Sequence, residues 1–147
     1  YPAGGLIRIH AKSAVLNGTL NAKPLMGYYG GSSGGGIWVT TSSRMEIGVT
    51  FAALVRGGSS NTGADGGGGR IALGEQLTDT EVAKLAADGE VPLRGSRRKP
   101  IPVLTQKEFE SLYSGATIDL TAGGSHGQPG TFAFLNGAKK GLILMVR

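Results

Sequence analysis

A unit of two glycines followed by alternating apolar residues recurs three times in the first half of the chain. No other feature limits the fold more strongly. The copies begin at Gly4, Gly35 and Gly68, at intervals of 31 and 33 residues. A second segment recurs in register with the first two copies, at residues 16–22 and 47–53. Because apolar residues alternate and turn-forming residues bound each run, every unit predicts two short β-strands separated by a turn.

Units of this size favour a stacked architecture. A short strand cannot bury its apolar face alone, whereas successive units bury it by pairing edge to edge through backbone hydrogen bonds. The glycine runs 27–36 and 57–69 then form the turns, where a positive φ or a close approach of two backbones is required. With 27 glycines in 147 residues and only 6% aromatics, the core must consist of small and aliphatic side chains. Residues 1–76 therefore predict a mainly β fold built as a short glycine-rich β-solenoid.

Three stretches carry a resemblance to a known group of proteins. Residues 34–40 (GGGIWVT), 47–53 (IGVTFAA) and 66–73 (GGGGRIAL) resemble the glycine-rich repeats of large secreted bacterial surface proteins. The resemblance covers residues 4–74. It implies a right-handed β-helix with an adhesin-like, structural or polysaccharide-associated role, secreted or held at the bacterial cell surface. Because the third copy lacks the second segment, only about two and a half units are visible, fewer than the three that a free-standing solenoid needs. We therefore expect the first strand to pair with something else.

The second half of the chain changes to helical signals. Leu77–Val82 and Leu104–Phe109 each place a threonine three residues before a glutamate, between flanking apolar residues, which is the start signal of a capped helix. Gly89 and Gly115 supply the stops. Because helices of about ten residues are unstable alone, both are expected to pack against the strands.

The tail returns to strand patterns. Residues 131–135 are joined through Asn136 and Gly137 to the apolar run 142–146, which predicts a C-terminal β-hairpin. A strand that is apolar on both faces is buried in a sheet or donated to a neighbour. The chain thus divides into glycine-rich repeats at 1–76, two capped helices with a basic proline-bounded linker at 77–115, and C-terminal strands at 116–147. It opens with Tyr1 instead of methionine, which suggests a processed form or a fragment.

The net charge of +5 is spread unevenly, and its tightest basic cluster lies at residues 94–99. We interpret this cluster as a solvated linker, since no aromatic residue interleaves the charges as stacking on nucleic acid requires; nucleic acid is not an expected partner. The alternative function is a carbohydrate-binding or polysaccharide-active module, with aromatic faces for sugar rings and cations for acidic groups. Its candidate ligand surface consists of Tyr28, Tyr29, Trp38, Arg94, Arg97, Arg98 and Lys99.

No motif assigns a catalytic residue, a metal or a cofactor. His10 and His126 lie far apart, with no carboxylate at a ligand spacing. Residues 63–66 match a calcium-binding β-roll only weakly, because the aspartate does not recur on successive turns. Phosphate-binding, dinucleotide-binding and nucleophile-elbow motifs are absent, as are cysteines and any apolar stretch long enough to span a membrane.

These observations favour an interaction protein over an enzyme. We expect an extracellular structural, self-assembling or adhesive protein that acts through strand-edge association with another copy or with a neighbouring domain. A filament follows if the end of one copy fits the start of the next. The expected assembly edges are Leu6, Ile7, Ile9, Leu142, Ile143, Leu144 and Val146.

Overall fold

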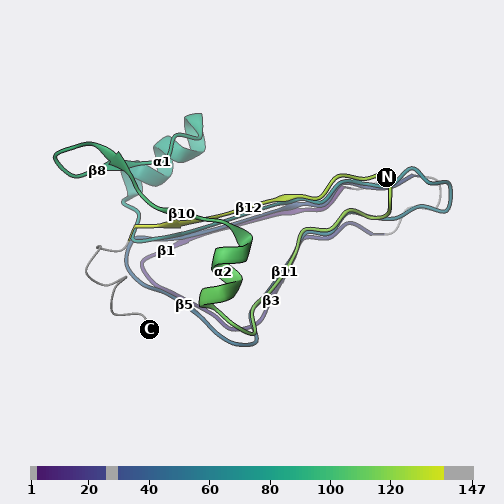
Figure 1. Ribbon diagram of the computed structural model, residues 1–147, viewed down its shortest axis with the longest axis horizontal. Coiled ribbons are helices and arrows are strands. Elements are labelled where there is room, and N and C mark those ends of the chain that lie inside the picture. The colour runs from purple at the N-terminus through teal and green to yellow at the C-terminus, as the bar shows by residue number, and fades with distance from the viewer. Residues whose placement is uncertain (1–2, 26–29, 138–147) are drawn as a thin grey trace.

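The computed structural model describes residues 3–25 and 30–137. Within these ranges the chain forms twelve strands and two helices (Figure 1). The elements, in chain order, are β1 Leu6–Ala11, β2 Ala14–Leu16, β3 Thr19–Asn21, β4 Gly36–Thr41, β5 Met45–Ile47, β6 Ala52–Leu54, β7 Arg70–Glu75, α1 Asp79–Asp88, β8 Leu93–Arg94, β9 Lys99–Pro100, β10 Val103–Leu104, α2 Gln106–Leu112, β11 Thr117–Asp119 and β12 Thr131–Asn136.

Most of the strands pair in parallel. The largest sheet has the order β1-β4-β7-β12-β10, and β10 is its one antiparallel member. A second sheet has the order β11-β6-β3, and a third pairs β2 with β5; both are parallel. Strands β8 and β9 form a separate antiparallel pair.

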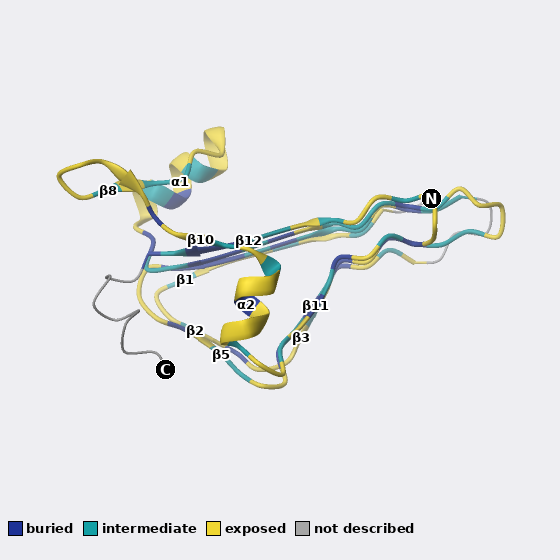
Figure 2. Cartoon of the chain, viewed as in Figure 1, coloured by how far each residue is buried: buried dark blue, intermediate teal, exposed yellow. Residues whose placement is uncertain are grey.

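Equivalent strands of successive repeat units lie side by side in one register. Ile7 of β1 pairs with Ile37 of β4, which pairs with Ile71 of β7, which pairs with Phe132 of β12. Their side chains contribute to one hydrophobic core, which the three parallel sheets surround (Figure 1). Figure 2 shows buried residues along the inner strands and exposed residues over much of both helices.

Each of the first two repeat units contains three strands, where the sequence predicts two. The expected second strand is divided by Asn17 and Gly18 in the first unit and by residues 48–51 in the second. The Thr50 hydroxyl donates a hydrogen bond to Asn17 Oδ1 at 2.5 Å, which links the two bends. The additional corner allows the chain to form a third sheet around the core.

The predicted starts of both helices and the stop at Gly89 are confirmed, whereas α2 ends at its C-cap Tyr113, before the predicted stop at Gly115. Thr78 is the N-cap of α1, its hydroxyl accepts from the Glu81 N–H, and Gly89 ends the helix in the left-handed region at a φ of 72°. At the start of α2, Thr105 and Glu108 form a reciprocal capping box. Local hydrogen bonding therefore fixes both helix starts.

The fold class is mixed α/β with parallel sheets, so the prediction of a mainly β, right-handed β-solenoid is wrong. The second half of the chain is the reason. Between β7 and β11 the chain leaves the repeat, and its helices enter the two hydrophobic clusters through the buried side chains of Val82 and Phe109. The expected C-terminal hairpin is also corrected in part. Strand β12 lies between β7 and β10, and the other predicted hairpin strand, 142–146, is outside the described residues.

The glycine-rich segments run beside one another beyond the sheets, as an extended arm in Figure 1. Of the described glycines in the two predicted turn runs, only Gly63 has a positive φ. Many of the other glycines in these runs lie where two backbone segments approach closely. A Cβ on Gly34, for example, would overlap the carbonyl oxygen of Val55. The backbone N–H of Gly69 donates to that same carbonyl at 2.8 Å. Glycine therefore permits the hydrogen-bonded contact between the two legs of the arm, which are the segment that leads into β7 and the segment that follows β6.

Candidate functional site

The first repeat unit supplies an outer strand to all three parallel sheets. Strands β1, β2 and β3 each lie at one end of their sheet's strand order. Leu6 on β1 and Val15 on β2 are 72% and 67% exposed. Ile9 is 37% exposed, whereas Val39, its register partner on β4, is fully buried. We name residues 6–21 the open layer, because each of its strands has a sheet neighbour on one side only.

The open layer is basic. Arg8 and Lys12 are its charged residues, and it contains neither aspartate nor glutamate. The Arg8 guanidinium lies 4.4 Å from the centroid of the Trp38 ring on the neighbouring strand, in a cation–π contact. Cations on an outer strand oppose its pairing with another basic edge, and salt screens this repulsion.

The opposite end of the large sheet is covered. There β10 pairs antiparallel with β12, and the Asn136 N–H donates to the Pro102 carbonyl at 2.9 Å. Helix α2 inserts Phe109 into the core, with its ring centroid 5.1 Å from that of Phe132 and 5.5 Å from that of Phe134. In Figure 1, α2 lies across the space that the sheets surround. The two ends of the large sheet are therefore chemically different. In the other two sheets, the ends opposite β3 and β2 are the outer strands β11 and β5.

Trp38 and the basic cluster lie in different cavities. The Trp38 side chain is half-buried, packs against a hydrophobic cluster, and lines a groove of about 420 Å³ with Leu6, Arg70 and Leu85. No residue of the basic cluster lines this groove. The predicted ligand surface is thus divided between the outer face of the large sheet and the β8–β9 hairpin.

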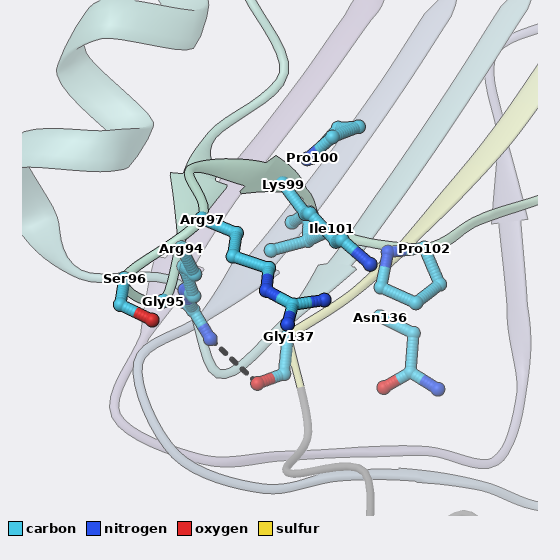
Figure 3. A pocket seen from close by; sticks show the side chains of 10 residues that line it. All are labelled: Arg94, Gly95, Ser96, Arg97, Lys99, Pro100, Ile101, Pro102, Asn136 and Gly137. Atoms are coloured by element: carbon cyan, nitrogen blue, oxygen red, sulfur yellow. Dashed lines mark hydrogen bonds between the residues drawn. The ribbon is translucent and has the colours of Figure 1, made fainter.

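The basic cluster surrounds a pocket of about 450 Å³ beside the β8–β9 hairpin (Figure 3). Arg94 closes its inner side, donating to the carbonyls of Gly137 at 2.6 Å and of Gln76. The same guanidinium donates to both carboxylate oxygens of Glu81 on α1, each at 3.0 Å. Arg94 therefore ties the hairpin to α1 and to the ends of β7 and β12.

The other cations of the cluster are distributed around the hairpin. Arg97 and Lys99 line the pocket, and neither forms an ion pair with any described residue. Arg98 faces a second pocket of about 280 Å³, which Glu81, Lys84 and Glu90 also line. The structure thus brings Arg94, Arg97 and Lys99 together and places Arg98 elsewhere.

His10 makes contacts that its sequence neighbours do not indicate. Its Nδ1 lies 2.8 Å from Thr40 Oγ1, and its Nε2 lies 2.8 Å from a carboxylate oxygen of Asp79 at the start of α1. Hydroxyl, imidazole and carboxylate in this order resemble a nucleophile relay. Thr40 is buried, however, so its hydroxyl is closed to a substrate. The cluster joins β1 to α1. Because His10 and Asp79 lie 69 positions apart in the chain, no local sequence pattern indicates it.

A second histidine contact lies in the glycine-rich arm. The backbone N–H of His126 donates to the Asp65 carboxylate at 3.3 Å and lowers the pKa of Asp65 below its ordinary value. Nδ1 of the same histidine lies 3.4 Å from this carboxylate. Across residues 3–25 and 30–137, no group of three or more histidine and acidic side chains is arranged to hold a metal ion. Neither described helix has the length and apolar character needed to cross a membrane.

Several predicted site residues are outside the described residues. They are Tyr28, Tyr29, Leu142, Ile143, Leu144 and Val146. The predicted edge residues that are described, Leu6, Ile7 and Ile9, all lie on β1. Strands β2 and β3 were not expected at the edge, although the repeated second segment at residues 16–22 and 47–53 indicates further strands in each unit.

Comparisons of the chain with protein-family models, with curated proteins and with solved structures find no match.

Proposed function

We propose that this chain is a structural interaction protein whose open layer joins another β layer edge to edge. The supporting observation is that β1, β2 and β3 occupy outer positions in all three parallel sheets. A strand added to β1 would pair with backbone groups that have no sheet neighbour and would cover the exposed side of Ile9. Main-chain pairing supplies the affinity in such contacts, and the side chains supply the selectivity.

The partner that we propose is a second copy of the chain. Because β10 and α2 cover the far end of the large sheet, the open layer of one copy meets the open layer of the other. A contact between identical surfaces closes into a two-fold dimer. A filament, as expected from the sequence, needs a second edge, and its predicted residues 142–146 are outside the described residues. An adhesive role in secretion or at the cell surface stays part of the proposal on the resemblance of residues 4–74.

The charge of the open layer gives this association a recognisable salt dependence. Each open layer presents Arg8 and Lys12 without an acidic residue, so two of them repel each other. Salt screens charges on exposed surfaces, and the apolar and backbone contacts are affected far less. We therefore expect dimerisation to strengthen as the ionic strength rises.

Sedimentation velocity over a concentration series tests the proposal. We expect conversion from monomer to dimer, which Val15→Lys in the open layer prevents. The control is Val49→Lys, because Val49 is also an exposed valine, at 73%, and lies outside the open layer. A chain that stays monomeric at every concentration and salt level would refute the proposal. So would equal effects of the two lysine substitutions.

A further inference from the structure

We infer that the pocket beside the β8–β9 hairpin binds an acidic oligosaccharide through Arg97 and Lys99. The inference is independent of the open layer, which lies on other strands. The pocket, at about 450 Å³, is in the size range of small-molecule sites and exceeds the needs of a single inorganic ion. None of the described residues that line it is acidic.

The charges of the pocket are arranged for an anion. The Arg94 guanidinium already donates hydrogen bonds to the Glu81 carboxylate and to backbone carbonyls, so Arg94 positions the hairpin. Arg97 and Lys99 have no such partner among the described ion pairs, and in Figure 3 the Arg97 side chain reaches across the pocket toward Gly137. A guanidinium binds a carboxylate or sulfate through two parallel hydrogen bonds, and an ammonium adds a point charge.

The remaining wall suits a sugar ring. Pro100, Ile101 and Pro102 supply apolar surface, while Ser96 and Asn136 supply polar groups. Ligand sites combine apolar walls with a few polar groups in this way, and a pyranose presents apolar ring faces together with hydroxyls. No described aromatic residue lines the pocket, so a nucleic-acid base finds no stacking surface there. The proposed ligands are therefore oligosaccharides that carry carboxylate or sulfate groups.

Arg98 provides a matched control. It follows Arg97 directly in the chain and carries the same charge, but it lines the second pocket, beside Glu81 and Glu90. Arg97→Gln and Arg98→Gln consequently lower the net charge by the same amount while altering different pockets. Because the two variants have the same net charge, a difference in their affinities reports binding at the pocket and not a general attraction of anions to the protein.

Isothermal titration calorimetry of the full chain tests the site with four probes. They are trigalacturonate, a sulfated trisaccharide, the neutral trisaccharide maltotriose, and a thymidine oligonucleotide of similar length. We expect binding of one or both acidic saccharides and none of maltotriose, and the two acidic probes distinguish carboxylate from sulfate. Loss of one exposed ion pair predicts about a 5-fold weaker affinity for Arg97→Gln. Arg98→Gln is expected to bind within about 1.5-fold of the unaltered chain.

Four results would overturn the inference. They are absence of binding to both acidic saccharides, equal weakening by the two substitutions, equal affinity for maltotriose, and tighter binding of the oligonucleotide. Circular dichroism of each variant, unchanged from the parent chain, shows that a loss of affinity is not a loss of fold. Because the open layer is unaltered in both variants, sedimentation of the same samples keeps this test separate from that of the proposed dimer.

Discussion

Glycine at the contacts between the legs of the arm removes Cβ atoms that would collide with backbone. A Cβ on Gly34 would overlap the Val55 carbonyl and crowd the N–H of Gly69 at 2.5 Å. Backbone cannot move aside as a flexible side chain can, because its hydrogen bonds fix it on both sides. Side-chain volume at this position therefore determines whether the arm can form.

Gly34→Ala is predicted to destabilise the protein by about 2–4 kcal/mol, the range for overpacking combined with broken backbone pairing. Gly18→Ala is the control, since a Cβ on Gly18 has no atom within 4 Å and the position needs no positive φ. Urea unfolding of the two variants measures the difference in the free energy of unfolding. Equal stability of the variants would contradict the close-packing explanation.

Asp65 is the residue whose titration bears on the stability of the arm. The backbone N–H of His126 is the main cause that lowers its pKa from the ordinary 3.8. A carboxyl with a lowered pKa in the folded state stabilises the protein above its unfolded pKa and loses that contribution as the pH falls through the folded pKa. The contribution is thus complete at neutral pH and absent in strong acid.

Asp65→Asn is accordingly predicted to lower the melting temperature at neutral pH, because the amide provides no negative charge for the His126 N–H. The gap between variant and parent chain should narrow as the pH falls below 3.8. Thermal unfolding followed by circular dichroism over this pH range measures it. A gap of constant size from neutral to acidic pH would show that ionisation of Asp65 is not the cause.

At the scale of elements, α2 closes the core rather than lying on a finished surface. Phe109 is fully buried and contacts two phenylalanines of β12 and Tyr113. Burial also raises the pKa of Tyr113 above its ordinary value. The stability of the covered end therefore depends on α2. The sequence signals of this helix predict where it begins but not what it packs against.

Phe109→Ala is predicted to cost about 3–5 kcal/mol, the usual range for removing a buried aromatic side chain. Leu112→Ala, on the exposed side of the same helix, should cost less than about 1 kcal/mol. Guanidinium unfolding of both variants provides the comparison. If the two costs were alike, α2 would be a peripheral helix and the covered end would need another explanation.

Local sequence patterns predicted where individual helices begin better than they predicted which distant segments pair with one another. The capping of α1 and α2 could be predicted because Thr78 and Thr105 bond within a few residues of themselves. The antiparallel β10 could not, since its two residues pair with Phe134 and Leu135, which lie 30 and 32 positions further along the chain. Likewise, Arg94 meets Gln76, Glu81 and Gly137 only because distant segments converge at the hairpin.

For the whole molecule, the repeat in the sequence predicted strands at the right places but the wrong fold class. The alternation of apolar residues places Ile7, Ile37 and Ile71 at corresponding positions, and these residues do pair. The glycine intervals of 31 and 33 residues each miss the observed register by one residue. The repeat carries no information on what covers the ends of the sheets. That depends on residues after position 76, where the helices and β10 make the protein mixed α/β.

The open layer and the covered end of the large sheet are expected to respond differently when copies of the chain associate. Hydrogen–deuterium exchange of the backbone amides at low and at high protein concentration tests this expectation most directly. Residues 6–21 are predicted to gain protection with concentration, while β4 and β7, which already have a neighbour on each side, stay unchanged. Unchanged exchange in residues 6–21, or added protection confined to β10 and α2, would contradict the account.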